Sequence, residues 1–130
     1  MLLIFDPVHA AELEVSGLRS GDGHLAVSVF ADAGGFPGDA GQAATTYYIP
    51  LEGRRVVDFT IENLPEGAYA IAILHDEDSD KKLRSFLGIP REGFGFSNNP
   101  LIVAGPPSFG KARVELSPGA KIAIRMKYML

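Results

Sequence analysis

The chain has 130 residues, 46% of them hydrophobic, a formal net charge of -4 and no cysteine. This length accommodates one domain with a substantial core, and the hydrophobic content excludes a disordered chain. The acidic balance disfavours nucleic acid as a partner, because phosphates require clustered Lys and Arg. No segment reaches the roughly 18 consecutive apolar residues of a membrane-spanning helix. The lack of cysteine excludes disulfides, thiol catalysis and zinc–thiolate sites.

The N-terminal residues 1–11, MLLIFDPVHAA, are predominantly apolar and end in small residues on either side of His9. That spacing is typical of a signal-peptidase site, although no basic residue precedes the apolar run. We interpret the segment as the residual end of an export signal, with an ordinary N-terminal tail as the alternative. The interpretation predicts a periplasmic or secreted protein.

The first half of the chain contains three predicted strands. Residues 12–18 alternate between apolar and polar, and residues 25–31 do so after a Gly-containing turn, so the two strands are predicted to form a hairpin. The Gly-rich residues 32–44 predict a surface loop. Residues 45–51, TTYYIPL, predict an edge strand because Pro50 lacks a backbone donor, and an exposed edge permits dimerisation.

The remaining strands follow at regular spacing. Residues 54–62 alternate, and the sequence Leu-Pro-Glu-Gly at 64–67 predicts a type I turn. Residues 68–74, AYAIAIL, are apolar on both faces and predict a central strand that is covered on both sides. Residues 109–116 and 121–128 alternate on either side of a Pro-Gly turn and are predicted to form a hairpin.

Turn-forming residues are frequent throughout, with 15 Gly and 9 Pro. Together with the strands they predict an all-β fold, an antiparallel Greek-key β-sandwich of about seven strands, transthyretin/prealbumin-like or immunoglobulin-like. The predicted domain spans residues 12–130 and contains one long loop at 76–105. A loop of this length must form a small core of its own or stay mobile, and functional residues concentrate in such loops.

Three short motifs carry a resemblance to a known family: Leu-Pro-x-Gly-x-Tyr-Ala from Leu64, His-Asp-Glu from His75, and GIPREGFGFSNN from Gly88. With these motifs the chain resembles, from about Glu12 onward, the bacterial secreted family catalogued as domain of unknown function 2141, DUF2141, with a prealbumin-like or carboxypeptidase-regulatory-like sandwich. The resemblance implies an exported β-sandwich and supplies no activity. In members of that family the loop after His-Asp is usually similar to a calcium loop.

The corresponding loop of this chain has Asp76, Asp78 and Asp80 at alternate positions, so that their carboxylates can point at one cation. A calcium loop also requires Gly at its sixth position and Glu at its twelfth, where this chain has Lys81 and Leu87. Two interpretations follow. One is a Ca²⁺ site made by the three aspartates; the other, which the departures favour, is a solvated or ion-paired loop.

His75 ends the predicted central strand beside Asp76, and a histidine oriented by a carboxylate is a candidate general base. With Asp76 or Glu92 it would make a small hydrolase that resembles the transthyretin-like hydrolases in fold alone. The chain lacks the terminal Tyr-Arg-Gly-Ser of that group and the Gly-x-Ser-x-Gly nucleophile elbow. A histidine that is hydrogen-bonded to loop backbone is the favoured alternative, so we expect a non-enzymatic protein.

Farther along the loop, Phe94 and Phe96 alternate with glycines and precede Ser97, Asn98 and Asn99. An exposed aromatic pair beside amides can bind carbohydrate or peptide, whereas loop phenylalanines more often pack beneath their own loop, the arrangement favoured here. The complete predicted binding loop consists of His75, Asp76, Glu92, Phe94, Phe96, Ser97, Asn98 and Asn99. The sequence therefore predicts a binding or accessory module for a protein, peptide or carbohydrate ligand. A calcium-stabilised structural domain and a hydrolase that uses His75 are the alternatives.

Overall fold

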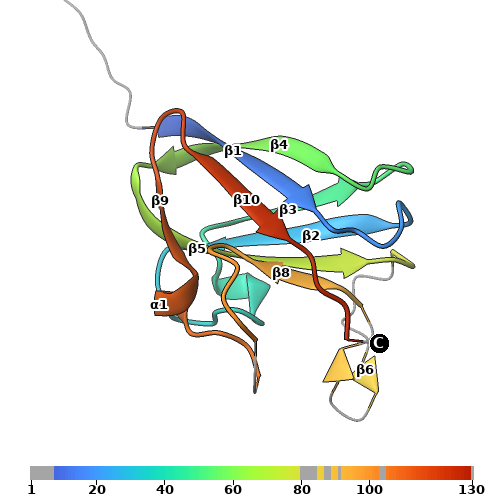
Figure 1. The fold of residues 1–130 in the computed structure, drawn as a ribbon. Coiled ribbons are helices and arrows are strands. Elements are labelled where there is room, and N and C mark those ends of the chain that lie inside the picture. The colour runs from blue at the N-terminus through green and yellow to red at the C-terminus, as the bar shows by residue number, and fades with distance from the viewer. Residues whose placement is uncertain (1–7, 80–84, 87–88, 91, 103–104, 130) are drawn as a thin grey trace, which may run out of the picture.

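The computed structural model describes residues 8–79, 85–86, 89–90, 92–102 and 105–129. These residues form two main β-sheets that pack face to face, with a small two-stranded sheet and two short helical segments outside them (Figure 1). The predicted all-β sandwich is confirmed.

The first sheet has three strands in the order β10-β1-β4. β1 (Val8–Ser16) is the middle strand, β4 (Val57–Pro65) pairs with it antiparallel, and β10 (Lys121–Arg125) pairs with it parallel. The period-two alternation that the sequence shows in these strands turns every second side chain inward. The fully or almost fully buried members of this inner face are Ala11, Leu13, Val15, Val57, Ile61 and Ile124.

The second sheet has five antiparallel strands. β3 (Thr45–Pro50) lies at its edge, as predicted, followed by β2 (His24–Phe30) and then by β5 (Gly67–Asp76). The other side of β5 pairs with both β8 (Phe94–Phe96) and β9 (Arg113–Leu116). The predicted central position of residues 68–74 is therefore confirmed, and their apolar character reflects neighbours on every side.

The core lies between the two sheets. Besides the inner face of the first sheet it contains Leu25, Val27, Val29, Leu51, Tyr69, Ile71, Ile73, Leu116 and Met126. Burial of this apolar area, at about 25 cal/mol per Å², is the main term that holds the sheets together.

Both predicted hairpins are wrong. β1 and β2 lie in different sheets, and so do β9 and β10. Alternation identifies the buried face of a strand, but in a sandwich the inner faces of both sheets look alike, so it does not identify the neighbouring strand. The parallel pairing of β1 with β10 is likewise an exception to the expected antiparallel order.

The first half of the strand predicted at 109–116 is instead the short helix α1 (Phe109–Ala112). Ser108 caps its N-terminus, because its side chain accepts a hydrogen bond from the backbone N–H of Lys111. Ala112 is still fully buried, but it lies outside the core cluster between the sheets, so the alternation that suggested a strand there was misleading. The predicted loop at 32–44 is irregular except for the 3-10 turn η1 (Ala40–Gln42).

Two further segments bear on the candidate site. The connection between β5 and β8 contains β6 (Ser85–Phe86) and β7 (Ile89–Pro90), which pair with each other and stand apart from the main sheets in Figure 1. At the N-terminus, Val8 and His9 lie within the segment interpreted as an export signal, yet they belong to β1 and pair with β4. Residues 1–7 of that segment lie outside the described residues.

Candidate functional site

The end of β5 places His75 and Asp76 on opposite faces of the sheet, because successive side chains of a strand alternate. His75 is fully buried on the inner side and Asp76 is 1% exposed on the outer side. The histidine and its sequence neighbour therefore belong to two separate clusters. This geometry offers no His75–Asp76 dyad for the general-base hypothesis.

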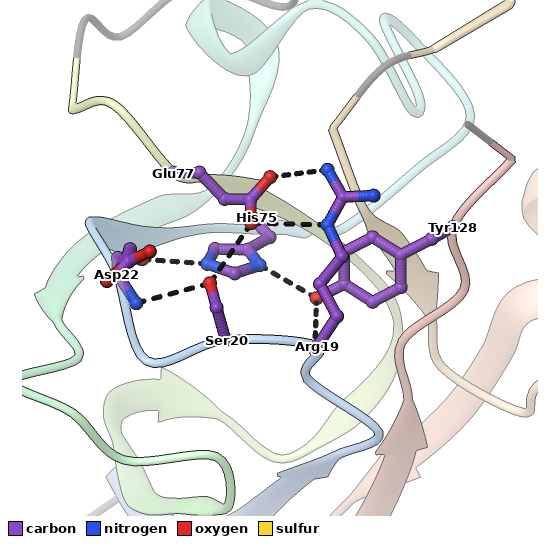
Figure 2. A network of polar contacts seen from close by, with 6 residues as sticks. All are labelled: Arg19, Ser20, Asp22, His75, Glu77 and Tyr128. Carbon is purple, nitrogen blue, oxygen red and sulfur yellow. Dashed lines mark hydrogen bonds and ion pairs between the residues drawn. The ribbon is translucent and has the colours of Figure 1, made fainter.

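Figure 2 shows the cluster around His75. Its Nε2 lies 2.8 Å from the backbone oxygen of Asp22, and its Nδ1 lies 2.7 Å from the hydroxyl of Tyr128. Because a carbonyl can only accept, Nε2 carries a proton, and in the neutral ring Nδ1 accepts from the Tyr128 hydroxyl. Both nitrogens are thus engaged within the protein, and the ring connects loop backbone to the C-terminal segment.

Arg19 and Glu77, drawn in Figure 2, extend this cluster toward solvent, since their side chains are 39% and 24% exposed. The Tyr128 hydroxyl accepts from the backbone N–H of Arg19 at 3.1 Å, and the Arg19 guanidinium lies 4.6 Å from the centre of the Tyr128 ring. The guanidinium also pairs with Glu77, Nη2 to Oε1 at 2.5 Å, and the Ser20 hydroxyl donates to Glu77 at 3.0 Å. The network joins the β1–β2 turn, the start of the β5–β8 connection and the C-terminal segment.

The electrostatics of this cluster follow from its contacts. Hydrogen bonding to Arg19 lowers the pKa of the Glu77 carboxyl below its ordinary value. Burial raises the pKa of the Tyr128 hydroxyl above its ordinary value. Sequence reasoning missed Arg19, Ser20 and Tyr128, since only their residue types, and no motif, distinguish them.

The outer cluster is built around Asp76. The Tyr48 hydroxyl donates to Asp76 Oδ2 at 2.6 Å, and the Tyr48 ring stacks on His24 with 4.2 Å between ring centres. Carboxylate oxygens of Asp76, Asp78 and Glu92 lie within 4.8 Å of one another. Asp76 and Glu92 are buried and Asp78 is exposed.

The structure thus brings together two of the three predicted metal ligands and adds Glu92, which the sequence placed in the binding loop. The third predicted ligand, Asp80, lies outside the described residues. Three carboxylates at this distance repel one another unless a cation or a proton compensates them. Oxygen donors of this kind suit hard cations such as Ca²⁺ and Mg²⁺.

The predicted binding residues after β8 are Ser97, Asn98 and Asn99, and all three form hydrogen bonds within the domain. Ser97 is fully buried; its hydroxyl accepts from Ile71 N at 2.8 Å and donates to the backbone oxygen of Ala112. The Asn98 side chain donates to Lys111 O at 2.9 Å. The amide of Asn99 joins β10 by two bonds of 2.9 Å, donating to Ala123 O and accepting from Arg125 N. These three side chains fix the corner after β8.

The phenylalanines of the predicted binding loop are half-buried rather than exposed. The rings of Phe94 and Phe96 lie 5.8 Å apart, and Phe96 lies 6.1 Å from Phe36 in the loop before η1. Phe36 in turn contacts Phe30 and Phe109 edge-on. This aromatic group covers the outer face of the second sheet, which is the packing role that we favoured from the sequence.

These features define the class of protein: a two-sheet β-sandwich domain with a buried polar network at one end and an elaborated connection that leaves the central strand there. The chain belongs to the DUF2141 family, described as an uncharacterized protein conserved in bacteria, whose model matches residues 13–123. Neither a curated protein nor a solved structure shows significant similarity to the chain. Within the described residues, no helix combines the length and the apolar character needed to cross a membrane.

Proposed function

We propose that the protein is a non-enzymatic, exported binding or accessory module that uses the connection between β5 and β8 to contact its ligand. The observation that supports this most directly is the anchoring of both ends of the connection, while β6 and β7 pair only with each other among the described strands. A loop that a rigid scaffold holds at both ends is a common way to present a binding surface.

The contacts narrow the region available to a ligand. At the first end, Tyr48 binds Asp76, and Arg19 with Ser20 binds Glu77. At the second end, β8 pairs with β5, and beyond β8 the side chains of Ser97, Asn98 and Asn99 bind backbone groups of the sandwich. Of the predicted loop 76–100, the part between these two anchored ends is the one that we assign to the ligand, a protein, peptide or carbohydrate.

The geometry of His75 supports the non-enzymatic part of the proposal. A general base must reach a proton of the substrate with an available lone pair. The Nδ1 lone pair of His75 faces the Tyr128 hydroxyl at 2.7 Å, and the ring is fully buried. Export remains part of the proposal on the strength of the apolar N-terminal residues.

Glycan and peptide arrays test the proposal. The wild-type protein is compared with a variant in which residues 80–91 are replaced by a short Gly-Ser linker, and with Glu115→Ala as an exposed control on β9. We expect wild type and the control to bind a common set of array ligands and the linker variant to lose them while its thermal unfolding stays cooperative. Empty arrays for wild type, or equal binding by the linker variant, would contradict the proposal.

A second candidate function is a calcium-stabilised structural domain, which the proximity of Asp76, Asp78 and Glu92 favours. Asp76 ends β5 and Glu92 lies just before β8, so a cation held by both would connect neighbouring strands. Bound Ca²⁺ would neutralise negative charge on the three carboxylates. Such a site would fix the beginning and the end of the connection between β5 and β8 relative to each other.

Thermal unfolding in calcium and in chelator tests this candidate, because a ligand that binds only the native state raises the midpoint. We expect calcium to raise the midpoint of wild type, magnesium to do so less, and Asp78→Asn to abolish the shift. Asp78 is exposed, so its substitution leaves the core intact. Superimposable wild-type curves with and without calcium would exclude the site and leave the array experiment unaffected.

A further inference from the structure

The two long sides of the sandwich differ. On one side, Phe94 and Lys127 exchange two backbone hydrogen bonds, of 2.9 and 2.8 Å, so that β8 joins the chain that follows β10. On the other side, β3 and β4 are the outermost strands of their sheets, and neither pairs with a further strand among the described residues. There the backbone N–H of Glu62 donates to the Tyr47 hydroxyl at 3.3 Å.

The direction of the β4 backbone groups follows from the pairing of β1. Glu12 N donates to Ala120 O and Ser16 O accepts from Met126 N, so these residues of β1 face β10. The alternate residues of β1, such as Leu13, therefore face β4, where Leu13 lies opposite Phe59. It follows that Asp58 and Thr60 direct their N–H and C=O groups away from β1, toward the open side.

Of the two open edges, β4 has no proline in its regular part. That part is residues 57–62, because the pairing register with β1 shifts beyond Ile61 and Asn63 has a φ of 66°, whereas β3 ends at Pro50. Among the described residues, the outward N–H and C=O groups of Asp58 and Thr60 are open to strand addition, in which main-chain hydrogen bonds provide affinity and alternate side chains provide specificity. The outward N–H of Glu62 is already bonded to the Tyr47 hydroxyl.

The two faces beside this edge differ in chemistry. On the outer face, Asp58 and Glu62 of β4 are exposed, and so are Glu12 and Glu14 of the neighbouring β1. A hollow of about 470 Å³ lies over this face, and three of these carboxylates line it with Lys121 as the opposing charge. On the inner face, Phe59 and Tyr47 are half-buried, with 5.6 Å between their rings.

We propose that the β4 edge binds an extended segment of a partner polypeptide in which basic and apolar residues alternate, and that this segment becomes the fourth strand of the β10-β1-β4 sheet. Its basic side chains would lie over the outer face beside Asp58 and Glu62. Its apolar side chains, on the opposite face of the strand, would cover Phe59 and Tyr47. A second copy of the chain fits less well, because two β4 edges would bring their acidic residues together.

The test uses a fluorescent nine-residue peptide of alternating Lys and Val, with a Glu and Val peptide as control, at low ionic strength because salt screens exposed charges. We expect saturable binding of the Lys peptide alone, with amide shifts in the NMR spectrum centred on residues 57–62. Thr60→Pro removes an outward N–H without touching the ladder to β1, so it weakens binding about tenfold or more, whereas Thr60→Val does not.

The double variant Asp58→Lys, Glu62→Lys changes exposed side chains only and provides a second test if Thr60→Pro does not fold. We expect it to abolish binding of the Lys peptide. Absence of binding to wild type, unchanged affinity in both variants, or shifts centred elsewhere would overturn the proposal. Self-association through β4, seen in sedimentation without peptide, would also overturn it by assigning the edge to a second copy.

Discussion

The alternating glycines of the Gly-Phe-Gly-Phe run at 93–96 are explained by the atoms against them. A Cβ added at Gly93 would lie 2.3 Å from Cε2 of the Tyr128 ring. One added at Gly95 would lie 2.8 Å from Ile124 Cγ2 and from Met126 Sδ, the far ends of flexible side chains. The chain approaches the C-terminal strand closely enough that only glycine fits without movement.

The first prediction concerns these glycines. Gly93→Ala should lower the free energy of unfolding by about 1–3 kcal/mol, because the new methyl overpacks against a ring that is itself held by His75. Gly95→Ala should cost less, since its neighbours can shift. Urea denaturation measures both, with Gly38→Ala as control because nothing lies within 4 Å of that position. Equal stability of the Gly93 and Gly38 variants would contradict the packing argument.

A second prediction concerns the Tyr128 hydroxyl. Tyr128→Phe leaves the Nδ1 of His75 without its donor and the backbone N–H of Arg19 without its acceptor. An unsatisfied buried group costs about 1–3 kcal/mol, so we expect a loss of that size in urea denaturation. Tyr47→Phe is the matched control, because its hydroxyl accepts one bond at an exposed position. A Tyr128 variant as stable as the control would show that the hydrogen bonds of the Tyr128 hydroxyl do not contribute to the free energy of unfolding.

At the scale of elements, one ion pair fastens the start of the β5–β8 connection to the β1–β2 turn. Hydrogen bonding to Arg19 holds the pKa of Glu77 below its unfolded value. The pair therefore stabilises the fold above the unfolded carboxyl pKa of about 4.3, and this contribution is lost as pH falls through the lower folded value. Its size is below about 1 kcal/mol, because the Arg19 and Glu77 side chains are 39% and 24% exposed.

Glu77→Gln tests that contribution. The variant should lose stability less steeply than wild type between about pH 5 and pH 3, because the carboxyl whose protonation breaks the pair is gone. Urea denaturation at each pH provides the slope, and Glu115→Gln, at an exposed position on β9, provides the control. A slope for the Glu77 variant equal to that of wild type would rule out the coupling.

The positions of two strands within the second sheet could be predicted from the sequence. Pro50 located β3 at an edge, and apolar residues on both faces located β5 at the centre. These are local properties of one strand. Which strands pair depends instead on which of the two sheets each strand joins, and the helix at 109–112 depends on the N-terminal cap supplied by Ser108. The alternation of apolar and polar residues reveals neither of these.

Some residues of the candidate site could likewise be identified from the sequence, and others could not. Asp76 and Asp78 were recognisable because they are two positions apart on one loop. Glu92 joins them because the chain returns beside the end of β5, where His75 N donates to Gly93 O. Arg19 and Tyr128 meet across 109 positions of sequence. Such long-range contacts require the strand order, which a single sequence does not supply.

At the scale of the whole molecule, the two ends of the chain depend on each other. β1 near the N-terminus pairs in parallel with β10 near the C-terminus, and Leu13 lies opposite Ile122. The segment after β10 then crosses to the other sheet through Phe94 and Lys127, and Tyr128 supports His75. The first sheet and one side of the sandwich are therefore incomplete until the last residues are in place.

The last prediction follows from this arrangement. A chain that ends at Ala120 lacks β10, so β1 loses one of its two neighbours and the core loses Ile124 and Met126, both almost fully buried. Loss of two such side chains alone exceeds about 4 kcal/mol, a large part of the stability of a domain of this size. Circular dichroism and amide NMR should show it unfolded. A chain that ends at Tyr128 removes only Met129, which is 54% exposed, and Leu130, and should fold. A folded, cooperatively melting protein ending at Ala120 would mean that the sandwich is complete without the pairing of its two ends.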